Sequence, residues 1–144
     1  MRKLDLVQQY PQPENEQATE RAAVDIIALH GLNAQSPRTW EAFKDGKTAE
    51  SGNIFWLKDH NMLPSAIPNS RILTNDYNAS YTTGASEETL TGHAVTLLYQ
   101  LDVNRKKAHR SNRLIIFIAS CFGGLLLAKA LITASRWHPL PPDS

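Results

Sequence analysis

The apolar segment at residues 114–131, LIIFIASCFGGLLLAKAL, constrains the fold more than any other part of the sequence. It carries no charge over residues 114–128, and this stretch of 15 residues is shorter than the roughly 18 that span a bilayer. Lys129 then interrupts it, and Ser120 and Gly123 lie near its centre. We therefore expect a buried strand, a tight turn and a buried helix, and no transmembrane segment.

Two further apolar runs, Val24–Gly31 and Ser70–Asn78, resemble the run Arg113–Ser120 in composition. All three are rich in β-branched residues and end in small or polar residues. The first and the third are almost continuously apolar, as expected for strands that are buried on both faces of a parallel sheet. The segment Leu4–Pro13 can add an edge strand.

Helices are predicted between and after these strands. Asn53–Leu63 has Phe55, Leu57 and Met62 near helical spacing, and prolines follow it. A second helix is expected over Ser86–Asn104, with Ser86 as its N-cap, and a third over Gly123–Trp137. The alternation of strand and helix predicts an α/β fold, a parallel sheet with flanking helices. The apolar stripe of the second helix consists of Leu90, Ala94, Leu97, Leu98 and Leu101.

The composition limits the class of protein. With 144 residues the chain forms at most one domain, and a formal net charge of +1 favours neither nucleic acid nor a membrane surface. One cysteine excludes an internal disulfide and a cysteine-based zinc site, and we expect no metal and no cofactor. The N-terminus lacks the apolar core of a secretory signal, so we expect an intracellular, cytoplasmic protein.

Two short segments suggest phosphate binding only at first sight. The basic run Arg105–Arg110 has no interleaved aromatic residues, and we interpret it as a solvated loop, with a phosphate or anionic-lipid contact as the alternative. Gly46-Lys47-Thr48 matches the end of a phosphate-binding loop. However, Glu41 stands where that motif needs its first glycine, so we do not assign it.

The turn around Cys121 matches a nucleophile elbow, a strained strand-to-helix turn that lifts one side chain above the carboxyl end of a sheet. Such a turn needs small residues two positions before and two after the nucleophile, because backbones approach closely there. Ala119 and Gly123 meet this need. The N-terminus of the following helix supplies backbone N–H groups that can hold an oxyanion.

The loop His30-Gly31-Leu32-Asn33 directly follows the first strand, so it should lie beside the elbow at the carboxyl edge of the sheet. A backbone N–H of Leu32 or Asn33 could join that of Phe122 to form an oxyanion hole. The Asn33 side chain could add a further donor.

These blocks resemble the N-terminal part of α/β hydrolases. The resemblance covers roughly residues 24–135 and is carried by the ordered set IIALHGLNAQSPRTWE, WLKDHNMLPSAIPNSRILTNDYN and RLIIFIASCFGGLLLAKAL. More narrowly, the chain resembles the lipase and serine-esterase-like domains at the N-terminus of multidomain fungal proteins, including NACHT- and ankyrin-bearing receptors. It also resembles serine-active-site proteins of the mitochondrion and endoplasmic reticulum. This resemblance implies an association with those two organelles as the alternative to the cytoplasm.

The resemblance also implies domain limits and site positions. Residues 21–136 would be the N-terminal part of a hydrolase-like domain, preceded by an edge strand and linker at 1–20 and followed by a proline-rich tail at 137–144. The family's elbow reads Gly-His-Ser-Leu-Gly-Gly, which puts Cys121 at the nucleophile position and Leu32 and Phe122 at the oxyanion hole. Cysteine in place of serine remains competent for acyl transfer once it is ionised.

The acid and the base of the family should follow the nucleophile on later strands. After Cys121 the chain offers only His138 and Asp143, and a helix of about 20 Å should hold His138 away from the thiol. His30 is the best placed substitute, because its loop should border the elbow. The alternative is that His30 braces the oxyanion loop. Asp76 could face the same rim or could be a turn residue.

Two functions therefore stay open. The first is a lipase- or esterase-like protein that acts on an ester, thioester or lipid substrate, incomplete or inactive because acid and base are missing. The second is a non-catalytic interaction module of a larger signalling protein, which would have protein partners or partner domains. In either case we expect a three-stranded parallel sheet with an open edge, and a chain that is marginally stable, aggregates or pairs with a partner.

Overall fold

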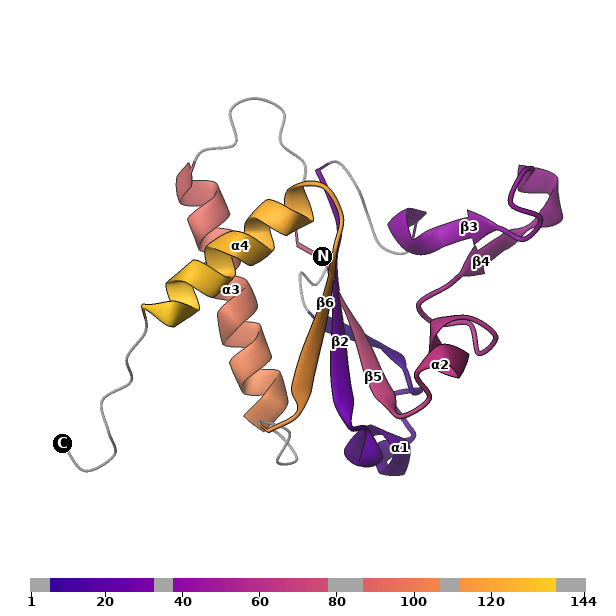
Figure 1. Cartoon of the computed structure of the whole chain (residues 1–144), viewed down its shortest axis with the longest axis horizontal. Coiled ribbons are helices and arrows are strands. Elements are labelled where there is room, and N and C mark those ends of the chain that lie inside the picture. Colours follow the sequence, from indigo (N-terminus) through magenta and orange to yellow (C-terminus); the bar gives the residue numbers. More distant parts are fainter. Residues whose placement is uncertain (1–5, 33–37, 78–86, 107–111, 137–144) are drawn as a thin grey trace.

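A computed structural model describes residues 6–32, 38–77, 87–106 and 112–136 (Figure 1). Its main sheet has the strand order β1-β5-β2-β6. The strands β2 (Val24–Leu29), β5 (Ser70–Asn75) and β6 (Leu114–Ala119) are parallel, whereas β1 (Leu6–Tyr10) pairs antiparallel with β5. The three predicted parallel strands and the added edge strand are therefore confirmed.

Two long helices cover one face of this sheet, α3 (Glu87–Lys106) and α4 (Phe122–Ser135). Both predicted helices are thus confirmed, while the predicted N-cap Ser86 lies outside the described residues. The predicted stripe of α3 does face the core: Ala94, Leu97 and Leu101 are buried there, and Leu90 and Leu98 pack against them. None of the described helices combines the length and the apolar character that crossing a membrane requires.

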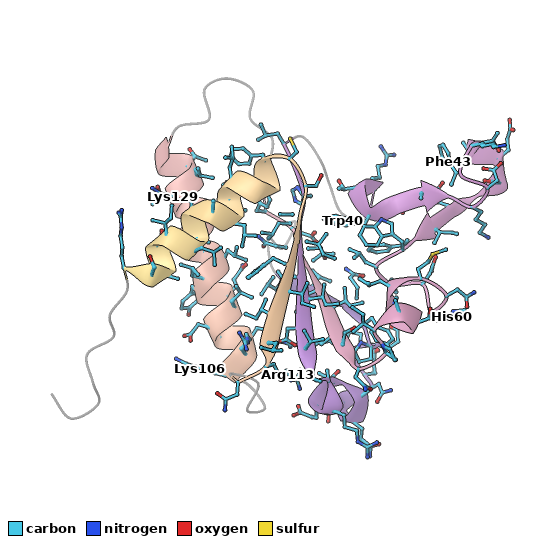
Figure 2. All side chains as sticks on the ribbon, viewed as in Figure 1. Trp40, Phe43, His60, Lys106, Arg113 and Lys129 are labelled. Atoms are coloured by element: carbon cyan, nitrogen blue, oxygen red, sulfur yellow. The ribbon has the colours of Figure 1, made fainter. Side chains whose placement is uncertain are left out.

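Shorter elements lie on the side of the other face, and some of them project away from the sheet (Figure 1). They are η1 (Arg38–Trp40), a two-stranded hairpin of β3 (Glu41–Phe43) and β4 (Asn53–Phe55), η2 (Ala49–Ser51) in its loop, and α2 (Leu63–Ala66). Helix α1 (Glu16–Arg21) lies at the amino end of the sheet. Trp40 fills this second core and points toward the sheet (Figure 2), with its ring 5.8 Å from that of Trp56 in an edge-to-face contact.

The side chains of β2 explain why its sequence is almost continuously apolar. Successive residues of a strand point to opposite faces. Ile27 and Leu29 accordingly pack against α3 and α4, and Ile26 and Ala28 pack in the core of Trp40. A strand with a core on each side needs apolar residues at both alternating positions.

The predicted helix over Asn53–Leu63 is wrong. Its first three residues form β4, which pairs with β3, and turns follow before the short helix α2. Long-range backbone bonds determine this conformation: the Trp56 N–H donates to the Trp40 carbonyl, and the Leu63 N–H donates to the Trp56 carbonyl. The apolar spacing had suggested a helix, but the hairpin partner decides the local structure.

The prediction that the third strand is buried on both faces is also wrong. β6 is an edge strand in the described part of the chain, and Leu114 and Ile116 are 77% and 44% exposed. The expected open edge is thereby confirmed for the described residues.

One buried carboxylate links most elements at the amino end of the sheet. The Asp25 side chain is fully buried and receives two hydrogen bonds from Arg71, at 2.9 and 3.0 Å. Arg113 approaches it at 3.2 Å and Arg105 at 3.6 Å. Arg113 also donates to the carbonyls of Thr19 and Glu20 at the end of α1, and Arg71 donates to Asn104 of α3. Asp25 therefore holds β2, β5, β6, α1 and α3 together.

Candidate functional site

Cys121 occupies the turn between β6 and α4 in a strained backbone conformation. Its φ of 55° and ψ of −120° make it the one non-glycine residue with positive φ among the described residues. A conformation of this kind costs of order 1–3 kcal/mol and persists only where the surroundings enforce it. The side chain is exposed to solvent. The turn therefore has the backbone strain and the exposed apex that a nucleophile elbow needs.

Close backbone packing around the turn enforces this conformation. The Ser120 N–H donates to the Leu29 carbonyl of β2 at 3.0 Å, just before the turn. Just after it, a Cβ on Gly123 would lie 2.5 Å from the Leu29 carbonyl oxygen and 2.8 Å from that of His30. The need for a residue without a side chain two positions after Cys121 is thus confirmed. By contrast, a Cβ on Gly124 would meet nothing within 4 Å.

The loop after β2 lies directly beside the elbow. Leu29 of β2 pairs with Ala119 of β6, so the two strands end side by side at the carboxyl edge of the sheet. A Cβ on Gly31 would lie 3.0 Å from the Cys121 Cβ and 3.6 Å from its Sγ. The expected proximity of the two loops is confirmed, and Gly31 leaves the space beside the thiol open.

The residues expected at the oxyanion hole are described only in part. Leu32 is 39% exposed at the start of its loop. Phe122 is half-buried, is the first residue of α4, and packs against the core below. Asn33 lies outside the described residues. The structure thus brings Phe122 and Leu32 to the same edge of the sheet.

His30 lies in the core and makes its contacts with Tyr77. Its ring is 2% exposed and stacks on the Tyr77 ring with centroids 4.3 Å apart and planes 2° from parallel. The Tyr77 hydroxyl donates to the His30 carbonyl at 2.6 Å, and the His30 Nδ1 lies 2.9 Å from the Gly31 carbonyl. No hydrogen bond joins His30 to Cys121. These contacts fit the alternative in which His30 braces the oxyanion loop.

A second histidine extends this stack. The His93 ring of α3 lies 5.3 Å from the Tyr77 ring. Burial lowers the pKa of His93 below its ordinary value of 6.5, because the charged ring would lose hydration. His93 thus favours its neutral form at neutral pH and packs beside the Tyr77 ring.

The other candidate residues are Asp76 and two residues outside the described ranges. Asp76 directly follows β5 and is half-buried, whereas His138 and Asp143 belong to residues that the structure does not describe. Within the described ranges, no three His, Cys, Asp or Glu side chains are grouped as a metal ion would require.

Gly46-Lys47-Thr48 forms the hairpin loop between β3 and β4. The Asp45 carboxylate accepts hydrogen bonds from the backbone N–H groups of Lys47 and Thr48, each at 2.8 Å, and from the Thr48 hydroxyl. These bonds hold the pKa of Asp45 well below its usual range. A loop organised around its own aspartate, with the three-residue η2 after it, lacks the helix N-terminus of a phosphate-binding loop.

Sequence reasoning missed the cluster around Asp25. The signal was present, because Asp25 and Arg71 are the second residues of two otherwise uncharged strands and face each other in register. A charged residue in a strand predicted to be buried requires a partner of opposite charge.

Comparison with known proteins adds no assignment to this geometry. No family model matches the chain, and no curated protein and no solved structure matches it either.

Proposed function

We propose that the chain is related to lipases and esterases of the α/β-hydrolase superfamily and that Cys121 is its nucleophile. The single observation that supports this most is the strained, exposed conformation of Cys121 between a parallel strand and a helix. Residues held in strained backbone conformations cluster at active sites and ligand-binding segments. Gly123, which fits this turn against the end of β2, supports the same proposal.

The reaction would be acyl transfer from an ester or thioester. The Cys121 Sγ, as thiolate, attacks the acyl carbonyl carbon, and the electron pair of the C=O bond moves to its oxygen. The resemblance to α/β hydrolases assigns the stabilisation of this oxyanion to the positions Leu32 and Phe122. Collapse of the intermediate expels the alcohol or thiol, which takes a proton from water, and leaves a thioester on Cys121. Water then hydrolyses the thioester, releases the carboxylic acid and restores the thiol.

The described residues provide a nucleophile but no general base that is hydrogen-bonded to it. A positioned base contributes typically 10²–10⁴-fold to such a reaction. Deacylation needs an activated water, so the absence of a base slows deacylation more than acylation. We therefore expect Cys121 to be acylated once by an activated ester and to turn over slowly.

The test is a burst experiment with a fluorogenic short-chain ester and the matching thioester. The expected result is release of one equivalent of fluorophore per chain, followed by a slow phase, with the acyl group found on Cys121 by mass spectrometry. Cys121→Ala should abolish the burst, whereas Cys121→Ser keeps the position and tests whether the site supports an alcohol nucleophile. If the wild-type protein is folded by circular dichroism and is not acylated, the proposal is wrong.

Gly31→Ala is a second variant that tests the site around Cys121. The added Cβ would stand 3.0 Å from the Cys121 Cβ and 3.6 Å from its Sγ. It should slow acylation by a bulky ester more than alkylation by a small thiol reagent. Equal slowing of both would indicate that the substrate does not approach over Gly31.

The second candidate function is a non-catalytic interaction module of a larger signalling protein. It is favoured by the position of His30, whose ring stacks on Tyr77 and makes no hydrogen bond to Cys121. In that case Cys121→Ala would change neither stability nor partner binding. The burst experiment separates the two functions, because only the first predicts an acyl group on Cys121.

A further inference from the structure

The outer edge of β6 is open in the described part of the chain. β6 stands last in the strand order, with β2 as its neighbour. The N–H groups along a strand point alternately to its two sides. Because the Ser120 N–H donates to Leu29 of β2, those of Ile115, Phe117 and Ala119 point to the outer edge. This edge therefore presents a row of backbone donors and acceptors to solvent.

Exposed apolar side chains lie on the edge strand itself and on α4, which packs against it. Leu114 and Ile116 are 77% and 44% exposed on the face where Ile118 packs toward Trp40. On the opposite face, α4 contacts β6 and exposes Leu125, 60%, and Leu131, 55%. An uncharged edge strand between apolar surfaces is a site for pairing with another strand.

The charges around β6 fit a second copy of the same strand. The segment Leu114–Ala119 carries no charged side chain. In an antiparallel pair related by a two-fold axis, the Arg113 end of one strand meets the Ser120 end of the other. Arg113 is also directed inward, since it binds Asp25 and donates to the carbonyl of Thr19. Self-pairing therefore brings no like charges together, which is the requirement that a two-fold interface must meet.

We propose that β6 pairs antiparallel with β6 of a second copy of this chain, so that the two sheets join into one across a two-fold axis. The three outward residues of each strand supply about six hydrogen bonds to the pair. Typical interfaces contain about ten, with a spread of five, so the strand pair alone approaches this range. The exposed leucine and isoleucine side chains beside the edge add apolar contact.

The experiment measures mass and amide exchange on the purified chain. Sedimentation equilibrium of the wild type should give twice the 16.1 kDa of the single chain. Amide exchange at Ile115, Phe117 and Ala119 should slow as the concentration rises. The double variant Leu114→Lys/Ile116→Lys places like charges in the proposed interface, and its dimer should be at least about a hundredfold weaker.

Phe43→Lys is the matched control, since it charges an apolar residue that is 43% exposed on the hairpin, away from β6 (Figure 2). The control should leave the dimer unchanged, and circular dichroism should show that all variants fold. Three results overturn the proposal: a monomeric wild type up to about 100 µM, where a specific homodimer should already form, open-ended aggregates without a dimer, or equal weakening by both substitutions. None of these readouts depends on the reactivity of Cys121, so this inference and the proposed function fail separately.

Discussion

The two ends of the parallel strands β2, β5 and β6 differ in almost every physical respect. At the amino end, Asp25 is fully buried and each of its oxygens accepts from a guanidinium. At the carboxyl end, Cys121 is exposed and its backbone is strained. The first arrangement minimises free energy locally, and the second is tolerated only because its surroundings enforce it. The comparison separates an end whose buried charges are paired from an end whose backbone is strained and whose thiol is exposed.

The largest effect is expected at the amino end. Asp25→Asn keeps the shape of the side chain but leaves Arg71, Arg105 and Arg113 without their carboxylate. Removal of one partner from a buried ion pair costs about 3–5 kcal/mol, a large part of the 5–15 kcal/mol that stabilises a typical domain. Urea unfolding should show a loss of this size.

Asp102→Asn is the matched control for this variant. Asp102 forms an exposed pair with Lys106 on α3 at 3.0 Å, and exposed pairs contribute less than about 1 kcal/mol. If both variants lose the same small amount, the amino end is not the stabilising region that we describe.

At the carboxyl end, Gly123→Ala tests whether packing enforces the elbow. The new Cβ would stand 2.5 Å from the Leu29 carbonyl oxygen, so α4 must move away from β2. We expect a loss of about 2–3 kcal/mol in urea unfolding, as for other overpacked sites. The adjacent Gly124→Ala meets no atom within 4 Å and should change stability by less than about 1 kcal/mol. Equal effects of the two substitutions would contradict the close packing.

Cys121→Gly should stabilise the protein, which sharpens the contrast between the two ends. Glycine adopts positive φ without steric cost, so the strain at φ 55° is released. Cys121→Ala keeps a Cβ and hence keeps the strain. We expect the glycine variant to be about 1 kcal/mol more stable than the alanine variant. At an unstrained position the glycine variant is ordinarily less stable than the alanine variant. If that order is found at residue 121, the turn is not strained.

The smallest effect is expected on the pH dependence of stability, through His93 in the ring stack of His30, Tyr77 and His93. Burial lowers the pKa of His93 in the folded protein, so the unfolded chain binds the proton more readily. The contribution of neutral His93 to stability is complete above the ordinary value of 6.5 and declines as the pH falls from there to the lower folded pKa. His93→Gln should reduce the slope of unfolding free energy against pH between about pH 5 and 7. An unchanged slope would assign the pH dependence to other groups.

Sequence reasoning worked where one element contains its own signal. The stripe on α3 and the apolar run of β2 predicted both elements, because side-chain periodicity reports which faces are buried. The elbow was predictable from Gly123 and Cys121 for a related reason: a tight strand-to-helix turn restricts residue size within a few positions. The expected oxyanion position Asn33 and the late candidates His138 and Asp143 lie outside the described residues.

Sequence reasoning failed where a residue far away in the chain determines the local structure. The set Phe55, Leu57 and Met62 had suggested a helix, yet Phe55 belongs to a hairpin strand whose partner begins at Glu41. Likewise, β6 has the composition of a central strand, but its position at the edge depends on the order of all four strands. The orientation of His30 depends on Tyr77, which is 47 residues away.

The sequence by itself thus determined the parallel strands, the two long helices and the turn at Cys121, because local periodicity and residue size specify these features. Only the tertiary structure decided that Asp25 collects three arginines, that His30 stacks on Tyr77, and that β6 presents an open edge. These contacts join residues far apart in the chain, and their energies depend on distances that no local pattern encodes.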